Sequence, residues 1–124
     1  MSKDSLLKFS FFLNGFILIL LGGVYLLAPS ISLIDGSHTT ESYSLLRLLS
    51  ISLVILGAIA MAFYKNFSSD NILIKQVSLA FIGFHILYCF HWYGYTTLGY
   101  PNLGYNIIPH ILLVLFGLFS FFRK

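Results

Sequence analysis

The sequence has few charged residues. Asp, Glu, Lys and Arg together make up 9% of the 124 residues, whereas hydrophobic residues make up 58%. A soluble domain carries roughly 25% charged residues, so this chain has too few charges to cover a water-exposed surface. We therefore expect the lipid bilayer to be the solvent for most of its surface. The length fits a single transmembrane domain over residues 1–124.

Cysteine, clustered positive charge and catalytic motifs are also scarce. The only cysteine, Cys89, excludes an internal disulfide and any CxxC redox or zinc motif. The net charge is +3, but the seven Lys and Arg residues are scattered and form no basic stripe, which argues against nucleic acid. The sequence contains no Gly-rich phosphate loop, no paired carboxylates within an apolar run and no Ser-His-Asp spacing. We therefore assign no catalytic residue and favour a protein without catalysis of its own.

Long apolar runs dominate the rest of the chain. About 20 apolar residues in a helix cross a hydrocarbon core of roughly 30 Å. The runs lack the period-two alternation of membrane barrel strands, so they are expected to be helices. The predicted spans are residues 9–28, 43–64, 77–95 and 105–122. Four helices with short links predict an all-α fold, an integral membrane four-helix antiparallel bundle.

The basic residues lie on one side of this predicted bundle. The links at residues 29–42 and 96–104 contain no Lys or Arg. Six of the seven basic residues flank the other ends of the runs: Lys3, Lys8, Lys65, Lys75, Arg123 and Lys124. The positive-inside rule then predicts that both termini are cytoplasmic in a multi-pass protein of the inner (cytoplasmic) membrane.

The seventh basic residue, Arg47, lies inside the second run. One interpretation is that its long side chain snorkels to the outer headgroups. The other is an inward-facing arginine that binds a ligand or pairs with Asp35 or Glu41 of the neighbouring link. In the first run Asn14 is expected to hydrogen-bond across helices.

Small residues within the runs suit close helix packing. They include Gly15, Gly22, Gly23, Ser50, Gly57, Gly117 and the pair Ala58 and Ala62. Such residues fit either packing within one chain or the interface of a homo-oligomer, and the sequence leaves both open.

The segment HILYCFHWYGY, residues 85–95, gathers histidine and aromatic residues in an otherwise aliphatic chain. His85, Tyr88 and Trp92 share one helix face, whereas His91 lies about 240° further round. If the link to the fourth helix centres near Tyr100, His91 and His110 lie at similar depth. His85 then lies about 9 Å deeper.

Three interpretations of this cluster remain open. One is an aromatic belt at the outer membrane interface, which fits Trp92, Tyr93, Tyr95, Tyr100 and Tyr105. His85, His91 and His110 are weak candidates for holding haem iron or another metal, because no HxxxH or HExxH pair is present. Alternatively, an outer-leaflet pocket binds a quinone or another apolar ligand. The candidate ligand-binding residues are Arg47, His85, Tyr88, His91 and His110.

The first half of the chain resembles the DoxX-like group of small four-helix bacterial membrane proteins. The resemblance rests on GFILILLGGVYLLAPS, a polar link, and SLLRLLSISLVILGAIA, over about residues 10–62. It departs at Ser50, where a glycine-rich stretch is expected, and in the number of histidines in the third run. The resemblance implies a four-helix bundle and, in some members, association with membrane redox enzymes or quinone chemistry.

Arg47 is the only candidate residue whose position matches one in that group. The predicted function is a non-catalytic accessory subunit of a larger membrane complex, or a binder of a quinone-like ligand. The alternatives are an oligomeric channel or transporter for ions or small molecules, and a membrane subunit that binds haem or a metal.

Overall fold

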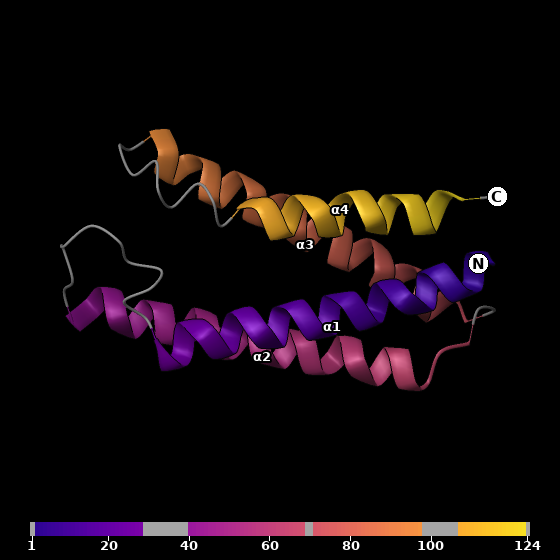
Figure 1. The fold of residues 1–124 in the computed structure, drawn as a ribbon, viewed down its shortest axis with the longest axis horizontal. Coiled ribbons are helices and arrows are strands. Elements are labelled where there is room, and N and C mark those ends of the chain that lie inside the picture. The colour runs from indigo at the N-terminus through magenta and orange to yellow at the C-terminus, as the bar shows by residue number, and fades with distance from the viewer. Residues whose placement is uncertain (1, 29–39, 69–70, 98–106, 124) are drawn as a thin grey trace.

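The described part of the chain is entirely helical. The computed structural model describes residues 2–28, 40–68, 71–97 and 107–123, which contain four α-helices and no strand. The helices are α1 (Lys3–Leu27), α2 (Thr40–Lys65), α3 (Ile72–Thr97) and α4 (Ile107–Phe122). The predicted all-α fold with four helices is confirmed for these residues. The two ends of the chain lie at the same end of the long axis (Figure 1).

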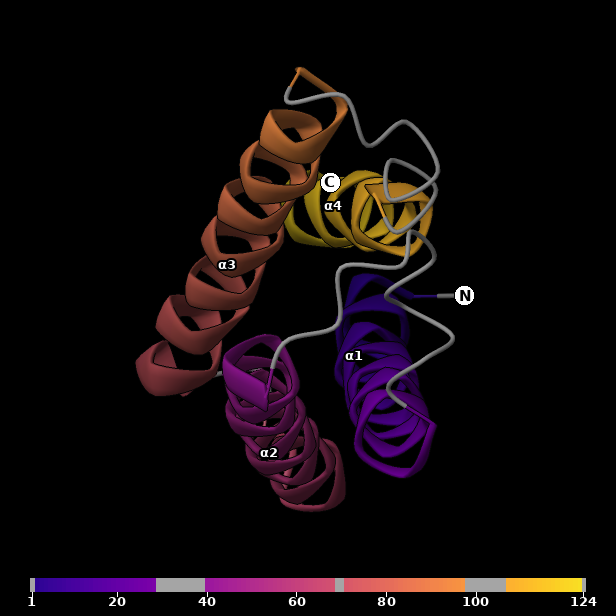
Figure 2. The same cartoon turned by 90° about the vertical axis from the view of Figure 1, so that its left-hand side faces the viewer.

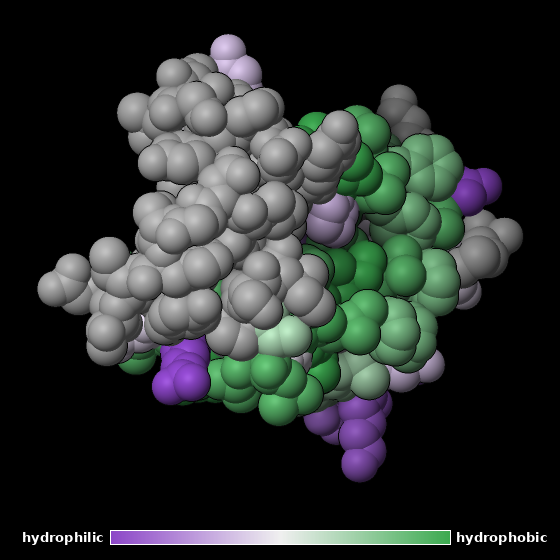
Figure 3. Space-filling model, turned by 60° about the vertical axis from the view of Figure 1, so that its left-hand side comes forward, coloured by the Kyte–Doolittle hydropathy of each residue, from purple (hydrophilic) through white to green (hydrophobic). Residues whose placement is uncertain are grey.

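Three of these helices are long and apolar enough to cross a membrane. They are α1, α2 from Ser44 and α3 as far as Gly94, with 25, 22 and 23 residues. α4 has 16 residues and is about 24 Å long, shorter than a typical hydrocarbon core. Large hydrophobic side chains on all four helices are exposed, and Figure 3 shows hydrophobic residues over much of the described surface. The chain is therefore a multi-pass membrane protein.

Helices α1, α2 and α3 extend beyond the apolar runs that predict them, whereas α4 begins at Ile107, two residues after the start of its run. α1 begins at Lys3 instead of residue 9, because the Ser2 side chain accepts a hydrogen bond from the Ser5 backbone N–H at 3.2 Å. α3 begins at Ile72 instead of residue 77, and Asn71 Oδ1 accepts from the Leu73 N–H at 2.9 Å. An apolar run marks the part of a helix that contacts lipid, whereas capping residues decide where the helix begins.

Close backbone contact joins α1 and α2, which lie side by side along their lengths (Figures 1 and 2). A Cβ placed on Gly22 would lie 2.7 Å from the Ser50 carbonyl oxygen, and one on Gly57 would lie 2.9 Å from the Gly15 carbonyl oxygen. Only glycine allows two helix backbones to approach this closely. The predicted packing role of these small residues within one chain is confirmed for this seam.

Other small residues of α1 and α2 lie outside the seam. A Cβ on Gly23 would meet nothing within 4 Å, and Ala58 and Ala62 are exposed. The reason is helix geometry, since Ala58 is rotated by about 100° from Gly57. The expectation that Gly23, Ala58 and Ala62 pack within the chain is therefore wrong. A role for them in a homo-oligomer stays a prediction.

The pair α3 and α4 packs against α1, mainly through α4 (Figure 2). Gly117 of α4 fits against Ile82 of α3, where a Cβ would lie 2.9 Å from the Ile82 Cγ1 atom. Phe9 of α1 meets Phe116 of α4 edge to face, with ring centroids 5.8 Å apart. Helix α1 thus contacts both partners of the second pair and connects the two halves of the molecule.

The hydrophobic core is richest in aromatic rings toward the end where both termini lie. Phe11 is 2% exposed, and its ring centroid lies 5.6 Å from Phe63 and 6.2 Å from Phe81. Further core residues are Leu7, Leu18, Tyr25, Leu46, Leu53, Ala60, Ile74 and Trp92. The polar site described next is embedded in this apolar interior.

Candidate functional site

Three polar side chains meet in the middle of the bundle. Asn14 of α1, His85 of α3 and His110 of α4 are 4%, 1% and 1% exposed. At 1.5 Å per residue, Asn14 lies about 16 Å from the start of α1 and His85 about 20 Å from the start of α3. His110 lies about 18 Å from the end of α4 by the same measure. The three side chains therefore sit at one depth, near the centres of α1 and α3 and one turn from the start of α4.

Hydrogen bonds connect these residues into one network, which we call the Asn14–His85–His110 network. His85 Nε2 lies 2.6 Å from Asn14 Oδ1, and His85 Nδ1 lies 2.8 Å from His110 Nδ1. The Asn14 amide nitrogen donates to the backbone carbonyl of Ser10 at 2.8 Å. The network therefore connects α1, α3 and α4, and the expectation that Asn14 hydrogen-bonds across helices is confirmed.

The direction of each hydrogen bond follows from the backbone carbonyl of Ser10. This oxygen can only accept, so the amide nitrogen of Asn14 faces it and the amide oxygen faces His85. His85 Nε2 must then donate, which leaves Nδ1 of a neutral His85 as an acceptor. Nδ1 of His110 is consequently the donor to His85. One carbonyl thus fixes the tautomers of two histidines.

Aromatic rings of α3 cover the histidine pair. The Tyr88 ring centroid lies 4.8 Å from that of His110, and the Phe84 ring meets His85 edge to face at 5.1 Å. Phe84 and Tyr88 also contact each other at 4.5 Å. These rings shield the imidazoles from lipid and restrict their orientation.

The structure brings together three of the five predicted ligand-binding residues. His85 and His110 share a hydrogen bond, and Tyr88 lies over His110. His91 is exposed, and its ring contacts those of Tyr88 and Trp92. Arg47 is exposed on α2, and within the described residues no hydrogen bond or ion pair joins it to the other four. Its suggested partner Asp35 lies outside the described residues, as does the side chain of Glu41.

The prediction that His91 and His110 lie at similar depth is wrong, because His110 pairs with His85. α4 begins at Ile107, only one turn before His110, whereas α3 runs on to Thr97, more than three turns beyond His85. The C-terminal end of α3 therefore extends past the start of α4. Counting residues from an assumed loop centre misses this difference in helix length.

Trp92 also departs from the aromatic-belt interpretation. It is 4% exposed and packs in the core, whereas the following residue, Tyr93, is 61% exposed. Trp92 lies seven positions after His85, so it points to the same interior face of α3. Of the other expected belt residues, the Tyr95 side chain, Tyr100 and Tyr105 lie outside the described residues.

The weak metal candidates do not converge on one point. Among the described residues, no group of three His, Cys, Asp or Glu side chains is close enough to hold a metal ion. His91 is exposed away from the pair, and the two Nδ1 atoms at 2.8 Å are at hydrogen-bonding distance. Two imidazoles bound to one zinc ion each lie at about 2.0–2.1 Å from the metal, which requires a wider separation.

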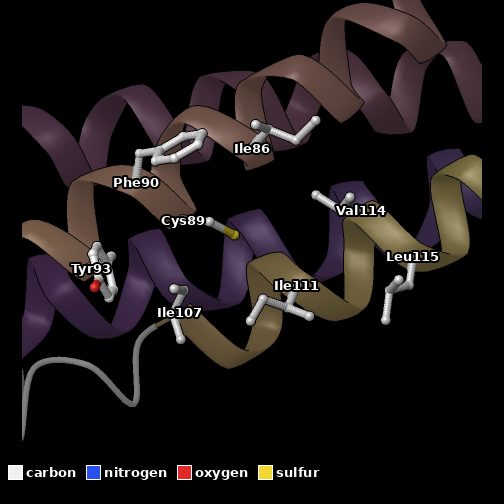
Figure 4. A pocket seen from close by; sticks show the side chains of 8 residues that line it. All are labelled: Ile86, Cys89, Phe90, Tyr93, Ile107, Ile111, Val114 and Leu115. Atoms are coloured by element: carbon white, nitrogen blue, oxygen red, sulfur yellow. The ribbon is translucent and has the colours of Figure 1, made fainter.

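An apolar crevice lies between α3 and α4, with a volume of about 400 Å³ (Figure 4). Its lining residues are Ile86, Cys89, Phe90, Tyr93, Ile107, Ile111, Val114 and Leu115. None of the five predicted ligand-binding residues is among them. Ile86 and Ile111 directly follow His85 and His110 in the sequence, so they are rotated by about 100° from the histidines. The crevice and the network therefore occupy adjacent faces of the same two helices.

Comparisons with protein family models, curated proteins and solved structures found no match to this chain. The resemblance to the DoxX-like group therefore stays a prediction.

Proposed function

We propose that this chain is an inner-membrane protein that binds a small apolar molecule along α3 and α4, without catalysis of its own. The observation that carries this proposal is the apolar crevice between these helices. Its volume of about 400 Å³ falls within the range of small-molecule sites, about 300–1,000 Å³.

The lining of the crevice indicates which part of a ligand it accommodates. Small-molecule sites usually combine apolar walls with a few polar groups that orient the ligand. Here the side chains are hydrocarbon except for the Cys89 thiol and the Tyr93 hydroxyl. The crevice therefore fits a hydrocarbon chain, such as the tail of a quinone-like molecule, better than a polar headgroup.

The proposed topology is an antiparallel bundle of four membrane crossings with both termini cytoplasmic. Figure 1 draws each helix returning along its predecessor, so both termini and the link between α2 and α3 lie at one end. Five of the basic residues that the structure describes are near this end, as the positive-inside rule requires of the cytoplasmic side: Lys3, Lys8, Lys65, Lys75 and Arg123. α4 completes the fourth crossing if the bilayer thins locally to match its shorter length.

The proposed partners are a larger membrane complex or further copies of this chain, in keeping with an accessory subunit of the DoxX-like type. The exposed pair Ala58 and Ala62 on α2 supports an interhelical contact, since small residues four apart allow close approach. Arg47, exposed on the same helix, fits a side chain that snorkels to the outer headgroups.

Ligand binding is tested by the melting temperature of lipid-stripped protein in detergent, with a long-tailed quinone and with its tail-less headgroup. We expect the long-tailed probe to stabilise the wild type, by about 2.7 kcal/mol at a hundredfold excess over the dissociation constant. Ile111→Trp fills the crevice and should abolish the shift. Ile51→Trp, at a similarly exposed position on α2, should retain it.

Equal stabilisation of all three proteins, or equal stabilisation by the tail-less headgroup, contradicts binding of a chain in the crevice.

The topology is tested by labelling a single cysteine. Ser5→Cys in a Cys89→Ser background places the thiol near the start of α1. A membrane-impermeant maleimide should label it only after the cells are opened. Labelling in intact spheroplasts would place the N-terminus outside.

A further inference from the structure

Three of the four ring nitrogens of His85 and His110 take part in the hydrogen bonds of the Asn14–His85–His110 network. With both rings neutral, His85 carries its proton on Nε2 and His110 carries its proton on Nδ1. The fourth nitrogen, His110 Nε2, then holds a lone pair that the network does not use. A proton that enters the intact network must bind at this atom.

We infer that the His85–His110 pair is a binding site for a single proton in the middle of the membrane, entered at His110 Nε2. Proton uptake from a hydronium ion forms one N–H bond at this nitrogen, breaks one O–H bond of the hydronium ion, releases a water molecule and transfers no electron. His110 becomes an imidazolium whose Nδ1–H still donates to His85 Nδ1 at 2.8 Å. The hydrogen bond becomes charge-assisted, which strengthens it.

The same geometry limits the site to one proton. A second proton has to bind His85 Nδ1, where it would point at the N–H of His110 across 2.8 Å. The hydrogen bond would be lost, and two positive charges would face each other in an apolar interior. The pair can therefore hold one proton or none while its hydrogen bond stays intact.

Asn14 ends the network, so the network does not conduct protons across the bundle. Its amide oxygen accepts from His85 Nε2, and its amide nitrogen donates to the Ser10 carbonyl. Neither an amide nor a peptide carbonyl takes up and passes on a proton as an imidazole does. A proton that arrives at His110 can be shared with His85 and leaves by the route it came.

Within the described residues, no acidic side chain contacts the pair to compensate the charge of the bound proton. On α3, Tyr88 lies over His110, and His91 lies beyond Tyr88. On α1, the pair meets the neutral amide of Asn14, whose nitrogen donates to the Ser10 carbonyl, and Tyr25 lies near Tyr88. In the described parts of α2 and α4, no titratable side chain except His110 is in hydrogen-bond or ring contact with the pair. Occupancy therefore depends on proton supply and on any anionic group that approaches, because a lone charge inside a membrane is costly.

The test is nitrogen-15 NMR of histidine-labelled wild-type protein in lipid nanodiscs, titrated from neutral to acidic pH. At neutral pH we expect a scalar coupling between the Nδ1 nuclei of His85 and His110, with Nε2 of His110 unprotonated. On acidification the pair should gain one proton, on His110 Nε2, and keep the coupling. The signals of the exposed His91 are assigned by their loss in His91→Phe.

Three outcomes would overturn the inference: a protonated His110 Nε2 at neutral pH, uptake of two protons by the pair, or no uptake before the protein unfolds. Because this measurement uses the wild type, it does not depend on a variant that folds.

Two substitutions of Asn14 sharpen the test. Asn14→Asp places a carboxylate against His85 Nε2 and should increase the protonated fraction of the pair at a fixed acidic pH, because the bound charge gains a negative partner. Asn14→Leu, of similar size, removes the acceptor and should allow both tautomers of His85. A protonated fraction that Asn14→Asp leaves unchanged, or tautomers unaffected by Asn14→Leu, contradicts the role assigned to this amide.

Discussion

Adjacent glycines of α1 provide a sharp test of how the bundle is packed. Gly22 faces α2, where an added Cβ would lie 2.7 Å from the Ser50 carbonyl oxygen and 3.0 Å from the Val54 backbone nitrogen. Gly23 is the next residue of the same helix, and a Cβ there would meet nothing within 4 Å. Substitution of each by alanine adds the same methyl group to the same helix. The difference in unfolding free energy between the two variants therefore measures the cost of the steric clash with α2.

The magnitude follows from the contact distances. Ordinary contact begins at 3.4 Å, so Gly22→Ala places the methyl about 0.7 Å too close to a backbone oxygen that cannot rotate away. If the helices separate by this amount, each remaining contact across the seam loses a quarter to a half of its attraction. Overpacking of this kind costs about 1–3 kcal/mol. The change in helix propensity is common to both variants and cancels in their difference.

The assay is the free energy of unfolding in detergent or bicelles, measured by steric trapping for the wild type and both variants. We expect Gly22→Ala to be less stable than Gly23→Ala by about 1–3 kcal/mol. The reasoning is refuted if the two variants differ by less than about 0.5 kcal/mol, the usual spread of surface substitutions.

Three further predictions concern the core, the network and the α3–α4 contact. Phe11→Ala removes a ring that is 2% exposed and should cost about 3–5 kcal/mol in unfolding free energy, whereas Phe16→Ala, at 54% exposure, should change it little. His85→Leu leaves two buried hydrogen-bonding partners unsatisfied, at about 1–3 kcal/mol each, and should lower the melting temperature more than Leu87→Ile on the exposed face. Gly117→Ala should cost less than about 1 kcal/mol in the same unfolding assay, because its methyl meets the Ile82 side chain instead of backbone atoms; a loss as large as that of Gly22→Ala would contradict this.

The sequence is sufficient to predict the class of protein and its helices. A chain with 9% charged residues and long apolar runs has to place helices in lipid, because only helices and closed barrels satisfy the backbone there. The number of helices and the hydrogen-bonding of Asn14 follow from the same reasoning. The ends of the helices are less predictable, since caps such as Ser2 and Asn71 extend them into polar flanks.

The composition of the site depends on tertiary structure. Helical periodicity places His85 and Trp92 on one face of α3, but it cannot tell which residue of α4 meets that face. That choice depends on where α4 begins and on how Gly117 packs against Ile82, and it pairs His110 with His85 instead of His91.

The sequence by itself thus determined that this protein is a helical membrane protein, because composition and periodicity are local properties of the chain. Only the tertiary structure decided that three polar residues from α1, α3 and α4 share one hydrogen-bonded network, and that an apolar crevice lies on an adjacent face of α3 and α4. The physical reason is register: a shift of one turn between two packed helices, about 5.4 Å, exchanges every side-chain partner while it leaves the hydrophobic pattern unchanged.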